Sequence, residues 1–330
     1  MQIKGFLSYI YFKILEKDIY TELDRKEKNQ IQRYFDLPED SENTDFDELN
    51  EYIERFKAIF KENFTEEQYE KMIYLLSSLK IKEYTMNYDG DLLISIGSYD
   101  SLNNTITITN YKDLDVELNK EEILIHELLH MASTNYSLDG ERTGLNLAGI
   151  LGVKLNEGYT EYLTRKYFTR GYKYTESTEN SIIFAKGIEN IIGSEKMESY
   201  YFNSDINSLI KDLSEYISIE DTIKLLYLID RVPDTKYRSK DFDYVLKKIS
   251  EINGMKLKKD LEKGNITEEE YEEQYAIKVR EYRNYQMWSE DTKVLGDETS
   301  FVLKDHEYTS DVYTRGYALK NKQKTKKILL

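Results

Sequence analysis

The chain has 330 residues, of which 40% are hydrophobic and 13% aromatic, so it is long and apolar enough to bury a sizeable core. Its formal net charge of -16 argues against a nucleic-acid-binding surface, because phosphate binding requires a concentrated basic patch. The absence of cysteine excludes disulfides and thiolate ligands, so a bound transition metal must be held by His, Asp or Glu side chains.

The N-terminal segment does not have the pattern of a signal peptide. Its apolar run, GFLSYIYF, is short, charge returns at Lys13, and no small-residue cleavage site follows. No stretch of the chain approaches the roughly 18 to 20 apolar residues of a membrane-spanning helix. We therefore expect a cytoplasmic protein with no transmembrane segment.

The first 80 residues have a helical pattern. Apolar residues recur at helical spacing from residue 5 to about residue 35, and an acidic linker follows them. A second helix is predicted from about residue 47 to residue 60, and Thr65 is the expected N-cap of a third. Residues 1–80 are therefore predicted to form an N-terminal helical region.

Three short runs then alternate with the period of a strand: IKEYTMNY, DLLISIGS and NNTITITN. Asp89-Gly90 separates the first two runs, and the polar segment SYDSLNN separates the second from the third. We predict three strands in a small antiparallel sheet.

Helical spacing returns at EEILIHELLHMAST and, after a stretch that contains four glycines, at LNEGYTEYLTRKYF. Later segments predict a series of further helices: NSIIFAKGIENIIG, DINSLIKDLSEYI, EDTIKLLYLIDRV, DFDYVLKKISEING and a long charged helix from Thr267 to about Trp288. The predicted fold class is α+β and mainly helical. Residues 81–200 would form a core of sheet and two helices, and residues 201–330 a C-terminal helical region.

One motif with chemical meaning lies in the first of these core helices. His126-Glu127-Leu128-Leu129-His130 matches H-E-x-x-H within an apolar helical segment, the context that this motif requires. Residues four apart project from one face of a helix, so both imidazoles can reach one Zn²⁺. Glu127 can take a proton from a metal-bound water as general base. With three histidines in the chain, the chance expectation is on the order of 0.003 matches, which disfavours two unrelated core histidines.

Two imidazoles and a water leave a tetrahedral site one ligand short. The best source of the missing ligand is the next helix, where Glu157 and Glu161 share a face at i and i+4. One of these glutamates is expected to bind the metal. The other can accept a hydrogen bond from a metal-bound imidazole and fix its tautomer.

These residues resemble the gluzincin metallopeptidases, which pair HExxH with a glutamate ligand on a following helix. The likeness to the thermolysin and aminopeptidase N families is one of motif and covers about 40 residues. It implies that Glu157, within Asn156-Glu157-Gly158, is the ligand and that Glu161 is the orienting residue. The 26 residues between His130 and Glu157 exceed the usual gap in those two families.

The resemblance has two further implications. A strand before the HExxH helix would be the edge along which an extended peptide pairs, which selects NNTITITN; the alternative is an ordinary sheet strand. A His or Tyr would stabilise the oxyanion, and His306 is the one remaining histidine. Tyr308 and Tyr313 are competing donors, and an idle surface histidine is an equal alternative.

The sequence therefore predicts a zinc-dependent metallopeptidase with His126, His130 and Glu157 as metal ligands and Glu127 as general base. Its partner would be a peptide or protein substrate, with Zn²⁺ as cofactor. The alternative is a non-catalytic helical interaction protein that holds a structural or lapsed zinc site. An open three-ligand site with an adjacent glutamate favours catalysis, because structural zinc sites are usually closed by four protein ligands.

Overall fold

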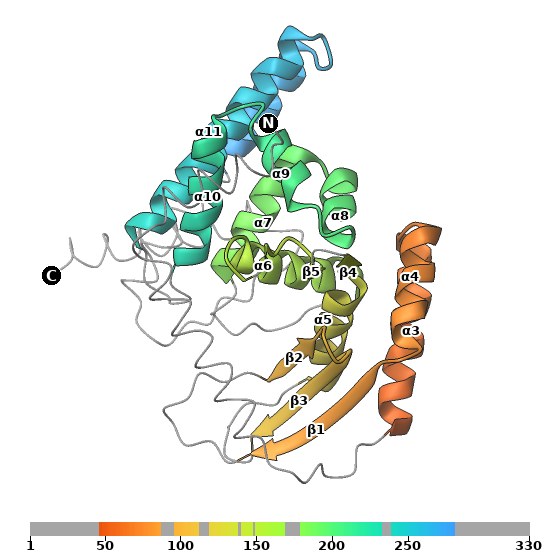
Figure 1. Ribbon diagram of the computed structural model, residues 1–330. Coiled ribbons are helices and arrows are strands. Elements are labelled where there is room, and N and C mark those ends of the chain that lie inside the picture. Colours follow the sequence, from red (N-terminus) through yellow and green to blue (C-terminus); the bar gives the residue numbers. More distant parts are fainter. Residues whose placement is uncertain are drawn as a thin grey trace, which may run out of the picture. The chain divides into compact units, whose positions relative to one another are not determined.

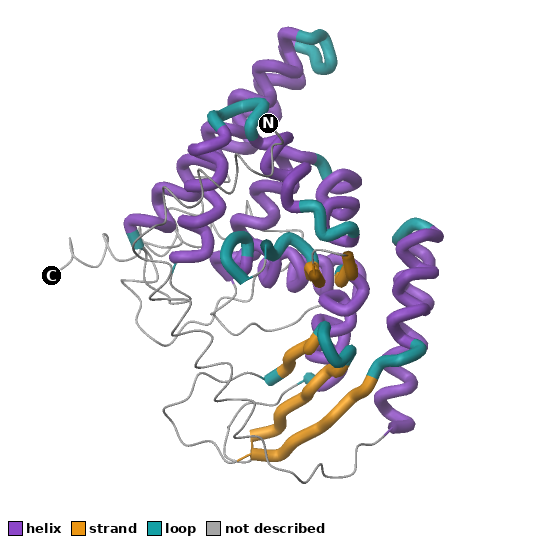
Figure 2. Tube along the Cα trace, viewed as in Figure 1, coloured by secondary structure: helices purple, strands orange, loops and turns teal. Residues whose placement is uncertain are grey.

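The structure is a computed structural model of the chain that describes residues 46–86, 96–111, 119–137, 140–147, 149–168, 179–232 and 239–280. The described residues are mainly helical, with one three-stranded sheet and one pair of short strands (Figures 1 and 2). The predicted mainly helical class with a small sheet is thereby confirmed. The chain divides into two compact units, residues 1–143 and 144–330, which we describe separately. The predicted divisions near residues 80 and 200 stay predictions.

In the first unit, α3 (Phe46–Asn63) and α4 (Glu66–Leu76) pack against each other and against α5 (Lys120–Ala132). Thr65 begins α4 with a complete capping box, as its sequence predicts: its side chain accepts from the backbone N–H of Gln68, and the Gln68 side chain accepts from the Thr65 N–H. Phe56 and Phe60 of α3 are fully buried.

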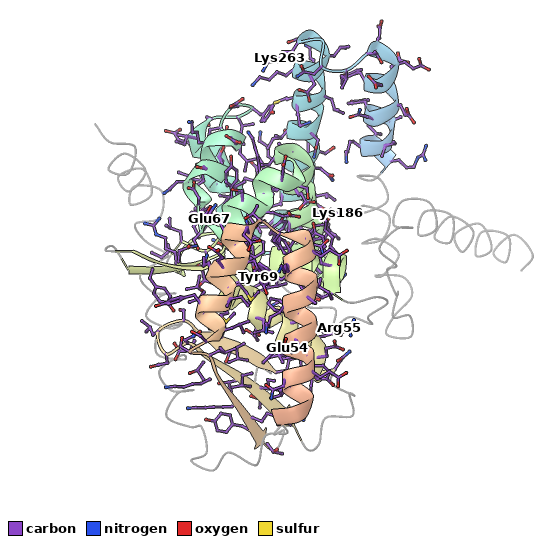
Figure 3. The ribbon with its side chains drawn as sticks, turned by 90° about the vertical axis from the view of Figure 1, so that its right-hand side faces the viewer. Glu54, Arg55, Glu67, Tyr69, Lys186 and Lys263 are labelled. Carbon is purple, nitrogen blue, oxygen red and sulfur yellow. The ribbon has the colours of Figure 1, made fainter. Side chains whose placement is uncertain are left out.

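Charged side chains lie on the outer surface of these helices. Glu54 and Arg55 lie next to each other on α3 (Figure 3). Arg55 pairs with Glu121 at 2.5 Å, and Glu54 pairs with Lys57 at 2.7 Å. Such exposed pairs contribute roughly 0 to 1 kcal/mol each, so burial of the apolar side chains is what holds this unit together.

The three-stranded sheet has the order β1-β3-β2, with β1 at Lys80–Met86, β2 at Gly97–Asp100 and β3 at Thr105–Tyr111. β2 pairs with β3 in antiparallel orientation, but β1 pairs with β3 in parallel. The predicted antiparallel sheet is therefore wrong for this pair. Alternation predicts that a segment is a strand but not which neighbour it pairs with, and here β3 lies between the two strands that precede it.

The central position of β3 corrects a second expectation. NNTITITN contains most of β3, and this strand is hydrogen-bonded on both sides. It therefore cannot be an edge along which a peptide pairs. In the described part of the sheet, β1 and β2 are the two edge strands.

The helix α5 (Lys120–Ala132) packs on β2 and β3. Asn119 is its N-cap, and its side chain accepts from the backbone N–H of Glu122. Ile106 and Ile108 of β3 are fully buried, so alternate residues of this strand form the apolar surface of the sheet. Two short antiparallel strands, β4 (Thr134–Ser137) and β5 (Gly140–Thr143), follow; the sequence pattern did not predict them.

The second unit is helical. It contains α6 (Val153–Leu163), the π-helix η1 (Thr164–Phe168), α7 (Glu179–Ile192), α8 (Ser194–Phe202), α9 (Ile206–Leu213), α10 (Ile219–Arg231) and α11 (Lys240–Glu262). The predicted helices in this half are confirmed where the structure describes them, and α8 was missed. The predicted charged helix from Thr267 is helical as far as residue 280, where the described residues end.

Close helix contact places α6 on α7. A Cβ at Gly158 would lie 2.3 Å from the backbone carbonyl of Ser181, so only glycine permits this approach. No helix among the described residues is long and apolar enough to span a membrane.

Candidate metal centre

His126 and His130 lie one turn apart on α5, the helix that packs on the sheet. The helix is held firmly, because Leu124, Ile125, Leu128 and Leu129 are all fully buried. This burial fixes the rotation of α5 and therefore the direction in which the histidine side chains project. His130 is itself buried, with 7% of its surface exposed.

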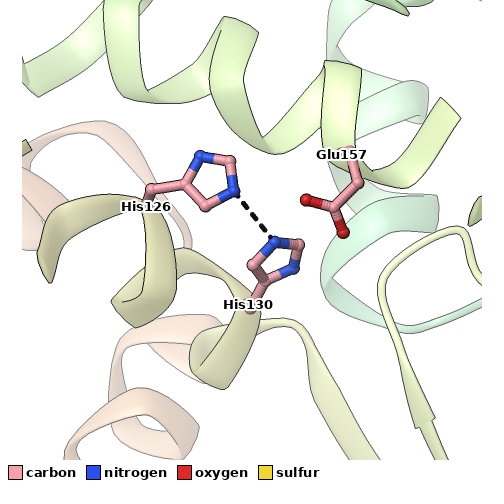
Figure 4. A group of neighbouring side chains, drawn as sticks. All are labelled: His126, His130 and Glu157. Carbon is pink, nitrogen blue, oxygen red and sulfur yellow. Dashed lines mark hydrogen bonds between the residues drawn. The ribbon is translucent and has the colours of Figure 1, made fainter. Parts of the chain in front are cut away.

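The two imidazoles meet at their Nε2 atoms, which are 3.1 Å apart (Figure 4). Their rings are tilted by 69° with centroids 4.8 Å apart. Two nitrogens that each lie about 2.0 to 2.1 Å from a tetrahedral zinc are about 3.3 Å from each other. The observed separation is therefore close to what two ligands of one metal ion require.

Glu157 of α6 completes the group. One ligand atom from each of His126, His130 and Glu157 lies within 4.8 Å of the others, and Figure 4 shows the three side chains pointing toward one another. These three residues can hold a metal ion. They are the three residues predicted from the sequence as metal ligands.

The donor set fits a divalent transition-metal ion. Two imidazole nitrogens and one carboxylate oxygen suit zinc and its first-row neighbours better than Mg²⁺ or Ca²⁺, which favour oxygen ligands. Three protein ligands leave one position of a tetrahedral site for water or substrate. Within the part of the chain that the structure describes, the group thus has the ligand number of an open site.

Glu127 follows His126 on α5, and 7% of its surface is exposed. Its side chain lies against β2, where a Cβ built on Gly97 would come within 2.7 Å of Glu127 Oε1. The structure thus places a buried carboxylate between the HExxH helix and the outer strand of the sheet. Its predicted role as general base stays a prediction.

Glu161 lies one turn after Glu157 on α6. Its Oε1 atom is 3.6 Å from Nε of Arg165 in η1, and both side chains are largely buried. Arg165 was not predicted, although its i+4 offset from Glu161 is visible in the sequence. That Glu161 also orients a metal-binding imidazole stays a prediction. His306, Tyr308 and Tyr313 lie outside the described residues, so the oxyanion donor is not placed.

A buried network fixes α6 against α7. Glu189 of α7 accepts hydrogen bonds from the hydroxyls of Tyr159 at 2.6 Å and Tyr162 at 3.1 Å. Burial, followed by the nearby Glu189 charge, raises the pKa of both phenols well above their usual range, so both remain donors. Tyr159 is two residues from Glu157, and this network therefore sets where the ligand helix lies. Because the chain contains many tyrosines, no sequence pattern distinguished Tyr159 and Tyr162 from the others.

Asp230 of α10 holds the first turn of α6. Its carboxylate accepts from the backbone N–H of Gly152 at 2.7 Å and of Lys154 at 2.9 Å. Gly152, the N-cap residue, has φ 78° and no side chain to satisfy these donors. A negative charge also suits the positive end of the helix dipole. Asp230 therefore does from a distant segment what an N-cap side chain usually does.

Comparison of the chain with known protein families, curated proteins and solved structures finds no match.

Proposed function

We propose that the protein is a zinc-dependent metallopeptidase of the gluzincin type, with a zincin-like core of sheet, α5 and α6. The observation that carries this proposal is the group of His126, His130 and Glu157, whose ligand atoms lie within 4.8 Å of one another. HExxH is a two-ligand motif, and a carboxylate from a second helix supplies the third ligand of an open catalytic site.

In the proposed mechanism, residues of the protein hold the reacting groups in place and transfer the protons. When bound, zinc would polarise the scissile carbonyl and lower the pKa of the attacking water. Glu127 takes the proton of that water and delivers it to the leaving amine, because it is the carboxylate adjacent to the first ligand. Its burial suits this role, since a proton acceptor shielded from bulk solvent transfers its proton to the substrate rather than to solvent.

We propose β2, rather than β3, as the strand to which a peptide substrate adds. β1 and β2 are the two edges of the described sheet, and of these β2 is the one whose first residue, Gly97, approaches Glu127. An extended peptide that adds to β2 would bring its backbone beside the general base. β2 is short, so this pairing would fix a few residues around the scissile bond.

The test uses the purified full-length chain. Bound metal is measured by elemental analysis, and cleavage is measured on a peptide library with and without a zinc chelator. We expect close to one zinc per chain and chelator-sensitive cleavage. A chain that binds zinc but cleaves no peptide would instead support the non-catalytic interaction protein with a structural or lapsed site.

A further inference from the structure

Gly97 occupies a position in β2 where the backbone itself does not demand glycine. It pairs with Ile108 of β3 in a regular antiparallel ladder, and it is not among the described glycines with positive φ. An alanine there would meet no backbone strain. The reason for glycine must therefore lie in what surrounds the missing side chain.

The missing side chain would point at α5. A Cβ at Gly97 would lie 2.7 Å from Glu127 Oε1 and 3.2 Å from Glu127 Cγ. It would also lie 2.7 Å from Cγ2 of Ile123. Ile123 and Glu127 are four residues apart and share one face of α5. The Glu127 carboxylate therefore occupies space that any other residue at position 97 would fill.

If a methyl group enters this space, Glu127 is the group that moves. Ile123 is branched at Cβ, belongs to the buried core and has little rotamer freedom. Glu127 touches the added carbon with the far end of a longer, unbranched side chain. A rotation of that side chain relieves its own overlap with the added carbon and displaces the carboxylate, whereas the overlap with Ile123 Cγ2 remains and costs stability.

We propose that Gly97 is a positioning residue: its lack of a side chain keeps the Glu127 carboxylate in place for proton transfer. This inference rests on the proposed peptidase function, in which Glu127 is the general base. The metal ligands make none of these close approaches to Gly97, so Gly97 acts on the proton transfer and not on metal binding.

The expected effect is on turnover. A misplacement of about 1 Å in a catalytic group can cost on the order of 100-fold in rate. We expect Gly97→Ala to lower kcat by about 10- to 100-fold while KM stays within about 2-fold and zinc content is unchanged. Gly254→Ala, in α11, where an added Cβ would meet nothing nearer than 3.7 Å, is the matched control and is expected to retain full activity.

A double-mutant cycle separates positioning of Glu127 from a general effect on β2. Glu127→Asp retracts the carboxylate by one methylene and removes its overlap with the added carbon, while the overlap with Ile123 Cγ2 is the same in both backgrounds. In that background Gly97→Ala is expected to cost less than about 3-fold further. An equal loss in both backgrounds would overturn the proposal, because Gly97 would then act elsewhere.

If Gly97→Ala folds poorly, melting temperatures provide a second test of the proposal. Because part of the overlap is with the end of Glu127, adding Glu127→Asp to Gly97→Ala is expected to raise the melting temperature. A double variant that melts no higher than Gly97→Ala alone would contradict the proposal.

A crystal structure of the zinc-loaded protein distinguishes failure of this inference from failure of the proposed function. We expect the Glu127 carboxylate of the Gly97→Ala variant to move by at least about 0.5 Å relative to the unaltered protein. If the unaltered chain cleaves no peptide, the proposed function fails while this displacement still tests the positioning. An unmoved carboxylate overturns the inference even in an active enzyme.

Discussion

His126 and His130 direct their Nε2 atoms at each other across 3.1 Å, a separation that two ligands of one metal ion share. Because a metal ion needs both rings neutral and unprotonated at these atoms, metal binding and protonation compete at this site.

His126→Ala and His130→Ala are each expected to abolish stoichiometric zinc binding, because each removes one of three protein ligands. Elemental analysis of the purified variants measures this directly. His306→Ala, which alters the one histidine outside the motif, is the control and is expected to retain zinc. Full zinc content in either motif variant would contradict the assignment of the ligands.

Glu157→Ala is expected to lose zinc more completely than Glu161→Ala. Removal of a direct ligand opens the site, whereas loss of an orienting partner typically lowers metal affinity about 10- to 100-fold. Competition with a chromophoric chelator gives both affinities. The opposite order would exchange the roles of the two glutamates.

Glu127→Gln is expected to retain zinc and to lower kcat by about 100- to 10,000-fold, the usual contribution of a general base. Glutamine keeps the size of the side chain but cannot accept the proton. Peptide hydrolysis and zinc content are measured on the same preparation. Undiminished hydrolysis would remove Glu127 from the mechanism.

Asp230→Ala is expected to lower the free energy of unfolding by about 1 to 3 kcal/mol, because the N–H groups of Gly152 and Lys154 lose their acceptor. Denaturant titration measures the loss. Lys224→Ala, at an exposed position of the same helix, is the control and is expected to change stability by less than about 0.5 kcal/mol. An equal loss in the two variants would show that the carboxylate does not anchor α6.

Stability is expected to fall above about pH 10 in a way that Tyr159→Phe reduces. Burial raises the pKa of Tyr159 above its ordinary value of 10.0, so the folded state keeps a proton that the unfolded chain releases. The contribution is therefore complete below that value and is lost as the pH rises through it. Melting temperatures from pH 7 to 11 measure the slope, with Tyr74→Phe, at a tyrosine 74% exposed, as the control. An unchanged slope in Tyr159→Phe would contradict the assigned cause.

Local signals in the sequence predicted most individual elements. The capping box at Thr65 and the apolar spacing of α5 depend on residues within a few positions of one another, and both are present in the structure. The pairing of β1 with β3 was predicted incorrectly, because strand direction depends on where the intervening chain passes. The close packing at Gly158 and the capping of α6 by Asp230 were not predicted for the same reason, since each residue contacts a segment remote in sequence.

The candidate metal ligands could be predicted from the sequence, because H-E-x-x-H and the later glutamate are recognised by residue identity and helical spacing. Only the folded structure shows which groups lie near this site: Gly97 lies beside Glu127, Arg165 beside Glu161, and Glu189 beside Tyr159. Helical periodicity is a property of neighbouring residues and can be read along the chain. Contacts between separate elements depend on how strands pair and helices pack, and that packing appears only in the folded molecule.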